Sequence, residues 1–599
     1  MVRLLSRESE VTKTRFAHKL PFGATLSDDG RRTRFRLWAP SAERVQLRIQ
    51  NGETTEMTPV DDGWFELETA APPGTRYKYV LPNSLGVPDP ASRLQDGDVH
   101  GWSVVVDPRA HEWHNVTWTG RPWHEAIVYE VHAGVMGGFD GLANALPHLQ
   151  EIGITAVEIL PIADFPGRRN WGYDGVLPYA PDEAYGTPGE LKTLIDKAHG
   201  LGLIMILDVV YNHFGPDGAY LHVYAREFFD EAKHTPWGAA IDFTKPEVRE
   251  YFIENALYWL MEYRFDGLRF DAVHAIEDKT FLRALAYAIR TRVEPGRQIC
   301  LVLEHEGNKA SLIGGGDLFD AQWADDAHHC WHVMLTGERE GYYADFADAS
   351  TLLAKALAEG FAYQGQTSPR GKRRGEPSAQ LPPRAFVFCL QNHDQIGNRA
   401  MGERLTQLAD PEALRAAAAV LLLAPEIPML FMGEEYGSRA PFLYFTDHHD
   451  ELAELVRNGR RTEFAHFAAF TDPKKREQIP DPNAPETFEL SIPDRADADP
   501  RTEAHYLILL ALRNRHIIPR IPGTTSLGAG PVGDTGVLAR WSMGDGSELI
   551  IASNLGGRPL PMDAVDGPLL FESRKGDADS ARNGRLPARC TVAFLQERT

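Results

Sequence analysis

The chain has 599 residues, 43% of them hydrophobic and 24% charged, and its net charge at pH 7 is −22. A charge of that sign repels phosphate backbones and anionic membrane surfaces, so we expect neither nucleic acid nor a membrane as a partner. The length exceeds what one hydrophobic core supports, and several globular domains are therefore expected.

The cysteines and the first residues indicate the compartment. The four cysteines have no CxxC spacing, and two of them stand inside apolar runs, as reduced, buried thiols do. The opening segment, MVRLLSRESEVTKTR, lacks the apolar stretch of a secretion signal. No segment approaches the roughly 18 apolar residues that cross a bilayer. We therefore expect a cytoplasmic protein without a membrane span.

Residues 1–110 predict an N-terminal β-sandwich of the immunoglobulin-like kind. Apolar and polar residues alternate there with a period of two, in short segments that Gly, Pro and Asp clusters separate. These segments are TRFRLWAP, RVQLRIQ, GWFELET and RYKYVLP. The same alternation returns near the end of the chain and predicts a small C-terminal β-sandwich over residues 520–599. Its segments are VLARWSM, ELIIASNL and CTVAFL.

Residues 111–519 predict a (β/α)8 TIM barrel. Short, fully apolar strands alternate here with amphipathic helices, which is typical of parallel βα units. The eight expected strands are IVYEVH, ITAVEIL, LIMILDVV, GLRFDA, ICLVLE, LFDAQW, AFVFCLQ and IPMLFM. A short insertion at 211–245 follows the third strand, and a loop at 363–383 precedes the seventh. We interpret the RGKRRG run within that loop as a solvated surface.

Two connecting segments predict helices on the outside of the barrel. In KPEVREYFIENALYWLMEYRFDG the apolar residues recur at helical spacing, and Glu254 falls with two other glutamates on the opposite side. In GELKTLIDKAHGLG an apolar stripe includes Leu191 and Ile195, and Gly202 is placed to end the helix.

Polar residues stand where the apolar strands stop. Catalytic groups of such barrels lie at the carboxyl ends of the strands, so these residues are expected to share one rim. They are Asp208, Asn212 and His213 after the third strand, Arg269, Asp271 and His274 after the fourth, Glu304 after the fifth, and His393 and Asp394 after the seventh. Burying so many charges costs stability unless they are paired or used.

Arg269 and Asp271 lie two residues apart on one strand, so both point to the same side, and the guanidinium favours an ionised Asp271. Glu304 would face like charges, which keep a proton on it. A carboxylate nucleophile beside a carboxylic acid is the arrangement of retaining glycoside hydrolysis, with the groups about 5 to 5.5 Å apart. Glu306 is the alternative acid, because alternation puts it on the same face. Glu304 is preferred since it directly follows the apolar run.

Structural interpretations compete for the other residues. Asp208 is expected to hold Arg269 in place rather than to contact a substrate. Each of the three histidines could be a buried core histidine. A zinc site is disfavoured, because no HxH or HExxH spacing occurs among them.

The segments DVVYNH, GLRFDAVH, VLEHE and QNHD together resemble the four signature regions of the alpha-amylase family, in the same order. The resemblance implies a nucleophile, an acid/base catalyst and a third acid that binds sugar hydroxyls: Asp271, Glu304 and Asp394. It also implies the sugar-binding residues Tyr173, His213, Arg269 and His393. His274 stands where many amylases continue with Lys-His, so its substrate contacts are expected to differ from theirs.

Four longer segments are similar to the family members that release trehalose from maltooligosyltrehalose. They are FPGRRNWGYDGVLPYAP, DGLRFDAVHAI, QNHDQIGNRAMGERL and GEEYGSRAPFLYFTDH. The N-terminal sandwich likewise resembles the carbohydrate-binding domain that precedes the barrel in those members. The resemblance implies maltooligosyltrehalose as substrate and maltooligosyltrehalose synthase as pathway companion. A branching enzyme, a general α-amylase and an inert glucan-binding protein are the alternatives, and the complete acid triad argues against the last.

No cofactor and no required metal are expected. Many amylases bind calcium through the asparagine that corresponds to Asn212, but the short insertion offers no acidic cluster for a calcium cage. The loops 363–383 and 439–448 are the candidates for recognising the trehalose end.

Overall fold

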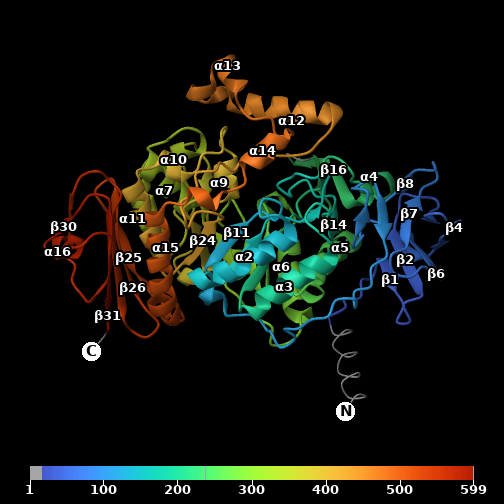
Figure 1. Ribbon diagram of the computed structural model, residues 1–599, viewed down its shortest axis with the longest axis horizontal. Coiled ribbons are helices and arrows are strands. Elements are labelled where there is room, and N and C mark those ends of the chain that lie inside the picture. The colour runs from blue at the N-terminus through green and yellow to red at the C-terminus, as the bar shows by residue number, and fades with distance from the viewer. Residues whose placement is uncertain (1–15, 236–237, 598–599) are drawn as a thin grey trace, which may run out of the picture.

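The computed structural model describes residues 16–235 and 238–597 (Figure 1). Residues 1–15 lie outside this part of the chain. They open the predicted N-terminal domain, and their sequence, MVRLLSRESEVTKTR, is the one in which no secretion signal was expected. Residues 236–237 of the predicted insertion and the last two residues also lie outside it. Three β-structured bodies follow one another along the long axis in Figure 1, from the N-terminal sheets (blue) through a barrel to the C-terminal sheet (red).

Eight parallel strands close into a barrel, which confirms the predicted fold class. The pairing of Val128 with Met429 joins the first strand to the last. Each observed strand lies inside the segment predicted for it. The strands are β11 (Val128–Val131), β12 (Ala156–Ile159), β15 (Ile204–Val209), β18 (Gly267–Phe270), β19 (Cys300–Leu303), β20 (Ala321–Trp323), β23 (Phe386–Cys389) and β24 (Ile427–Phe431).

Alternation along the strands divides the barrel interior into an apolar layer and a charged layer. Side chains two apart share a face, so Val128 and Glu130 point to the same side. The same spacing relates Ala156 to Glu158 on β12, and Ile206 to Asp208 on β15. The first member of each pair belongs to one buried apolar cluster. The second lies nearer the carboxyl end of its strand, so the charged layer is at the mouth of the barrel.

Helices cover the outside of the barrel. The longer ones are α2 (Gly138–Ile152), α3 (Pro188–Gly200), α5 (Pro246–Met261), α6 (Lys279–Arg292), α7 (Asp325–Thr336), α8 (Ala349–Glu359), α11 (Pro411–Leu423) and α15 (Pro500–Leu512). Helix α3 begins with a capping box between Thr187 and Glu190 and buries the predicted apolar stripe. It ends two residues before Gly202, whose φ of +73° suits glycine.

Helix α5 departs from the predicted pattern. Glu254 was placed on the side away from the apolar stripe, yet it is only 1% exposed. His18 Nε2 lies 2.6 Å from its Oε2, and Arg292 forms an ion pair with it. The prediction of a one-sided helix is wrong, because the segment that leads into the N-terminal domain covers the second face of α5.

The N-terminal domain contains two antiparallel sheets. One consists of β1 (Gly23–Leu26), β2 (Arg32–Trp38), β6 (Trp64–Ala70) and β5 (Thr58–Pro59). The other consists of β4 (Thr54–Glu56), β3 (Gln46–Ile49), β7 (Arg76–Val80), β10 (Trp102–Val104), β9 (Gln95–Asp96) and β8 (Gly86–Val87). Phe35 from the first sheet and Tyr77 from the second are in edge-to-face contact, with ring centroids 4.7 Å apart. The two sheets thus share one core.

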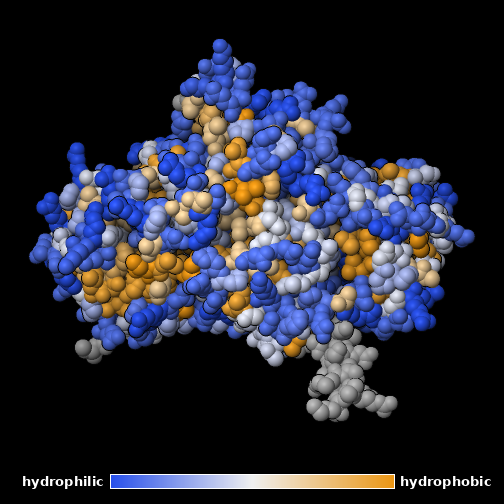
Figure 2. All heavy atoms as spheres, viewed as in Figure 1, coloured by the Kyte–Doolittle hydropathy of each residue, from blue (hydrophilic) through white to orange (hydrophobic). Residues whose placement is uncertain are grey.

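The C-terminal domain is a five-stranded antiparallel sheet with a small two-stranded sheet beside it. The large sheet consists of β25 (Thr525–Val532), β26 (Gly536–Ser542), β27 (Glu548–Asn554), β31 (Cys590–Gln596) and β29 (Leu569–Glu572). The small sheet pairs β28 (Leu560–Pro561) with β30 (Arg585–Leu586), next to α16 (Asp577–Arg582). The surface in Figure 2 is mostly hydrophilic, with an apolar area over this end of the molecule.

The sequence did not predict the helical segment between β24 and α15. It contains α12 (Asp450–Glu463), α13 (Pro473–Arg476) and α14 (Pro485–Leu490), and it projects above the barrel in Figure 1. Helix α12 has many charged residues, and Arg460 is its only buried residue. Such a helix contributes no apolar stripe to the barrel, so the pattern of alternating strands and helices did not include it.

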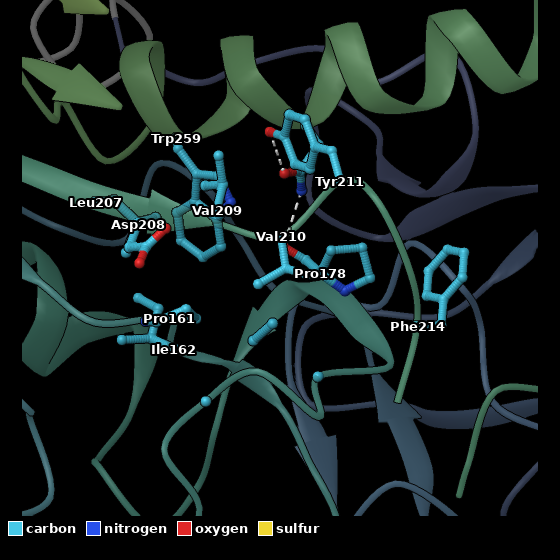
Figure 3. A pocket seen from close by; sticks show the side chains of 14 residues that line it. Pro161, Ile162, Pro178, Leu207, Asp208, Val209, Val210, Tyr211, Phe214 and Trp259 are labelled. Carbon is cyan, nitrogen blue, oxygen red and sulfur yellow. Dashed lines mark hydrogen bonds between the residues drawn. The ribbon is translucent and has the colours of Figure 1, made fainter. Parts of the chain in front are cut away.

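Helix α5 also anchors the segment that follows β15. Tyr211 donates a hydrogen bond to Asn255 Oδ1 at 2.7 Å, and Asn255 Nδ2 donates to the carbonyl of Pro178 at 2.8 Å (Figure 3). These residues border a small cavity of about 20 Å³, with Asp208 at its edge. The bonds tie the end of β15 and the strand β14 (Leu177–Pro181) to one helix.

The N-terminal domain contacts the rim of the barrel. Asp98 Oδ2 accepts a hydrogen bond from the backbone N–H of Gly167 at 2.9 Å. The next residue, Val99, is fully buried in a cluster with Val176 and Leu177 of the barrel. Residues 165–176 connect β13 (Ala163–Asp164) to β14, so this rim loop is held by a different domain.

Two carboxyl groups are buried beneath the rim loop. Asp164 is 1% exposed, and neither of its oxygens has a hydrogen-bond partner within the described chain. Burial raises its pKa well above the ordinary value, and the nearby Asp182 and Asp98 raise it further. Burial likewise raises the pKa of Asp182, to about 8, although two backbone hydrogen bonds to this carboxylate lower it. Protonation relieves this repulsion.

Asp164→Asn is expected to stabilise the protein more at pH 8 than at pH 5. The folded-state pKa of Asp164 is raised, so its contribution to stability is present at acid pH and is lost as the pH rises. The parent should lose up to about 1.4 kcal/mol per pH unit relative to the variant. Urea unfolding at both pH values measures the difference. Asp563→Asn, at an exposed position, is the control, and a pH-independent difference for Asp164→Asn would contradict the protonated state.

Candidate active site

One cavity at the carboxyl ends of the strands brings together the residues that the sequence assigned to catalysis and to sugar binding. Its volume is about 290 Å³. The predicted residues that line this central cavity are Tyr173, His213, Arg269, Asp271, His274, Glu304, His393 and Asp394. They come from the rim loop after β12 and from the ends of β15, β18, β19 and β23. The roles assigned to them remain predictions, but the expected convergence on one rim is present.

Arg269 connects the carboxylates. Its Nη1 donates to Asp208 Oδ2 at 2.6 Å and to Asp271 Oδ1 at 2.9 Å, while its Nη2 donates to Glu304 Oε2 at 2.7 Å. The side chain is 1% exposed, and its guanidinium carbon lies 4.1 Å from the ring centre of Trp323. A buried cation shared by three acids offsets part of their desolvation cost. It also holds Asp271 and Glu304 against neighbouring nitrogens of one rigid group.

Glu304 combines these contacts with a raised pKa. Burial is the main cause, and the charges of Asp271 and Asp394 add to it, whereas Arg269 acts in the opposite direction. The resulting pKa is about 8, so the group holds a proton at neutral pH. Arg269 and the backbone N–H of Ala272 both donate to Oε2, which leaves Oε1 to carry that proton.

Glu306, the alternative acid, has a different environment. Its side chain is 60% exposed and lies 4.0 Å from His274. It does not line the central cavity, whereas Glu304 does. The geometry therefore favours Glu304 of the two alternatives.

The backbone after Asp271 adopts an unusual conformation. Ala272 has a φ of +40°, in the left-handed region that non-glycine residues rarely occupy. In this conformation its N–H reaches Glu304, and the N–H of Val273 reaches the Glu304 carbonyl at 3.1 Å. Strained backbone of this kind is found at functional sites, where the surrounding structure enforces it.

Tyr173 and His393 form one wall of the central cavity. Their rings are stacked with centroids 5.2 Å apart, and the tyrosine hydroxyl lies 2.8 Å from His393 Nε2. His393 Nδ1 lies 2.6 Å from the carboxylate of Glu130 on β11. Burial lowers the pKa of His393, but Glu130 outweighs burial and the net pKa is raised. Both ring nitrogens of His393 thus have protein partners, Glu130 and Tyr173, and these contacts fix the orientation of the ring.

His213 and Asn212 hold the loop after β15 in place. His213 Nε2 lies 2.9 Å from the carbonyl oxygen of Tyr173. Asn212 Nδ2 donates to Asp271 Oδ2 at 2.8 Å. Asn212 therefore orients the predicted nucleophile directly. His274 lies at the opening, with about a third of its side chain exposed.

Sequence reasoning missed several residues of the site. Trp171, Asp174 and Tyr444 also line the central cavity. Glu130 and Trp323 support it from behind, through the contacts described above. Both stand at the ends of predicted strands, so the search for polar or aromatic groups at strand ends could have found them.

The two loops proposed to recognise the trehalose end differ in position. Tyr444 of the loop 439–448 lines the central cavity, whereas no residue of 363–383 does. The RGKRRG run is not uniformly solvated. Its Arg374 forms an ion pair of 2.6 Å with the fully buried Asp326, and Arg370 bonds to Asp345.

Three further features concern the described residues as a whole. In residues 16–235 and 238–597 no group of three or more His, Cys, Asp or Glu side chains is arranged to hold a metal ion. None of the helices in that part of the chain is long and apolar enough to cross a bilayer. All four cysteines are buried, free thiols.

Comparisons with known domains agree with the geometry. Residues 91–237 match the alpha-amylase catalytic domain, and residues 21–110 match carbohydrate-binding module 48, the isoamylase N-terminal domain. Residues 525–594 match a domain of unknown function. A pullulanase from Anoxybacillus sp. LM18-11, solved with maltotetraose, shares the fold with a TM-score of 0.64 at 17% identity, over 98% of this chain and 89% of its own. Fold and domains define a glycoside hydrolase of the alpha-amylase class.

Full-length relatives narrow the class. The malto-oligosyltrehalose trehalohydrolase of Deinococcus radiodurans is 40% identical over 544 residues, 89% of each chain. That of Saccharolobus solfataricus is 42% identical over 74% of this chain and 80% of its own. A Salmonella typhimurium protein, solved as a candidate alpha amylase, is 44% identical with a TM-score of 0.91, over 97% of this chain and all of its own. The chain belongs to the malto-oligosyltrehalose trehalohydrolase family.

Asp271→Asn is expected to reduce kcat at least about a hundredfold while leaving the fold intact. The amide keeps the hydrogen bond from Arg269 but cannot attack as a nucleophile. Steady-state kinetics and circular dichroism measure the two properties. Activity above about a hundredth of the parent rate would refute the nucleophile assignment.

The pH profile of kcat/KM is expected to fall above pH 8, because Glu304 must carry a proton to act as an acid and its pKa is about 8. Glu304→Gln should lower kcat by about 10² to 10⁴. Glu306→Gln is the matched control, expected to retain both the rate and the alkaline limb. If Glu306→Gln lost the activity and Glu304→Gln kept it, Glu306 would be the acid in place of Glu304.

Proposed function

We propose that the protein hydrolyses the α-1,4-glucosidic bond next to the terminal trehalose unit of maltooligosyltrehalose, releasing trehalose and a maltooligosaccharide. One observation carries the chemistry: a single buried guanidinium holds a carboxylate, Asp271, and a proton-bearing acid, Glu304, in the same cavity. The substrate choice is supported by the 40% identity to a trehalohydrolase over 89% of both chains.

The proposed reaction has two displacements. In the first, an oxygen of Asp271 attacks the anomeric carbon, the glycosidic C–O bond breaks, and Glu304 gives its proton to the departing trehalose oxygen. This leaves a covalent glycosyl ester on Asp271. In the second, Glu304 takes a proton from water, the water oxygen attacks the same carbon, and the ester bond breaks. The configuration at the anomeric carbon is retained, and Asp271 and Glu304 return to their starting states.

The remaining residues are proposed to bind the sugar at the cleavage point. Asp394 would accept hydrogen bonds from its hydroxyls, and the face of Tyr173 would lie against the ring. His393, held by Glu130 and Tyr173, would contact the same sugar. His213 and Arg269 would contact the same sugar. His274, at the opening of the cavity, would contact the neighbouring sugar unit. Protein contacts fix this wall of the cavity before the substrate binds, so its side chains need little reorganisation during the reaction.

The proposed substrate implies a companion enzyme. Maltooligosyltrehalose synthase is the proposed supplier of this substrate. We also propose that the protein acts in the cytoplasm, where four buried free thiols remain reduced.

Product analysis tests the proposal. Maltotriosyltrehalose and maltopentaose have the same number of glucose units, so only the terminal linkage differs. Chromatography is expected to show trehalose and maltotriose from the first, and at least about tenfold slower cleavage of the second, because a bound trehalose unit stabilises the transition state. Equal cleavage of both would identify a general amylase. New 1,6 linkages after incubation with amylose would identify a branching enzyme instead.

A further inference from the structure

A second hollow lies on the rim of the barrel, and we call it the rim cleft. Its volume is about 560 Å³, nearly twice that of the central cavity and within the range of about 300 to 1,000 Å³ typical of ligand pockets. Four segments border it, within residues 134–140, 168–169, 183–190 and 485–489. The last of these is helix α14, which lies above α2 in Figure 1.

The rim cleft shares a wall with the central cavity. Arg168 and Arg169 of the rim loop line the cleft, while Trp171 and Tyr173 of the same loop line the cavity. The wall is fixed in place, because Asp447 binds the backbone N–H of Arg168 and the side chain of Arg169. The two hollows therefore border the same loop.

Several polar side chains in the rim cleft have no hydrogen-bond or ion-pair partner within the described chain. Arg168, Glu183 and Glu489 are exposed, and their side chains make no hydrogen bond or ion pair anywhere in the described chain; the same holds for Asp140. Guanidinium groups donate hydrogen bonds and carboxylates accept them. A hydroxyl group does both, so a ligand rich in hydroxyls can use every one of these side chains.

The charges in the rim cleft select the kind of ligand. Four carboxylates and two guanidinium groups line it, on a protein of net charge −22. An anionic ligand, such as a phosphorylated sugar or a nucleotide, is therefore repelled. Two aromatic residues line it: Tyr185, which is buried, and Phe488, which is half-buried and packs edge-to-face on Phe445. A neutral, polyhydroxylated ligand with small apolar faces fits this lining.

We propose that the rim cleft binds the glucose units of an α-1,4-glucan chain that extend beyond the central cavity. The assignment rests on the proposed function, which supplies a linear neutral glucan as the ligand. The cleft then sets the preference for chain length: a substrate long enough to cross the rim loop gains contacts that a short one cannot reach. Arg168, from the rim loop, and Glu489, from helix α14, are binding residues of this second site.

A binding measurement tests the cleft independently of catalysis. In the Asp271→Asn protein, calorimetry is expected to give a Kd for maltoheptaose about tenfold below that for maltotriose, since one or two charge-assisted hydrogen bonds are added. Adding Arg168→Ala and Glu489→Gln should remove this advantage. The matched control adds Arg515→Ala and Glu53→Gln, two exposed positions outside the cleft, and should keep it. Circular dichroism verifies the fold of each protein.

Kinetics provide the second arm. The double variant Arg168→Ala/Glu489→Gln, with Asp271 intact, should lose the parent's preference in kcat/KM for long maltooligosyltrehalose over maltotriosyltrehalose. Equal affinity for maltoheptaose and maltotriose, or a length advantage that survives the double variant, would overturn the proposal. Absence of trehalose release by the parent would instead refute the proposed function, and calorimetry with maltooligosaccharides would still decide the cleft.

Discussion

The site depends on the electrostatic balance around one buried cation. Arg269 is the guanidinium that the charged layer of the barrel shares, and Asp208, Asp271 and Glu304 all bond to it. Acids that it does not neutralise must hold protons or find another cation. Glu158 shows the first outcome, because burial and then Glu130 raise its pKa well above the ordinary value. Glu304 keeps its proton although Arg269 bonds to it, because burial and the charges of Asp271 and Asp394 outweigh that cation and raise its pKa to about 8.

The scaffold keeps this arrangement fixed from several directions. Strands β11, β12 and β15 each place an apolar residue below and a carboxylate above, so the packing that closes the barrel also fixes the position of the charged layer. The loops at the rim are held by bonds to their surroundings, as with Tyr211 on helix α5 and Gly167 on the N-terminal domain. A site assembled before the substrate binds requires little movement for the reaction.

The sequence predicted those features that depend on local pattern. All eight strands were found because each is a short apolar run. Most of the candidate site residues were selected because each stands where such a run stops, whereas Tyr173 was selected by the resemblance alone. Features that depend on tertiary contact were missed. Glu254 has the spacing of a surface residue, but another segment covers it, and Arg374 sits in a charged run yet reaches the buried Asp326. Nothing in the composition of Ala272 signals its left-handed backbone, which its neighbours impose.

The bond between Asp98 and Gly167 bears on how such proteins diversify. Domains that recognise carbohydrate are commonly viewed as interchangeable attachments to a catalytic unit. Here the attached domain supplies an acceptor to the loop that separates the two sugar-sized hollows. Recombination that replaced it with an unrelated domain would leave that partition unsupported. Inheritance of the two domains as a pair is the arrangement that this contact favours.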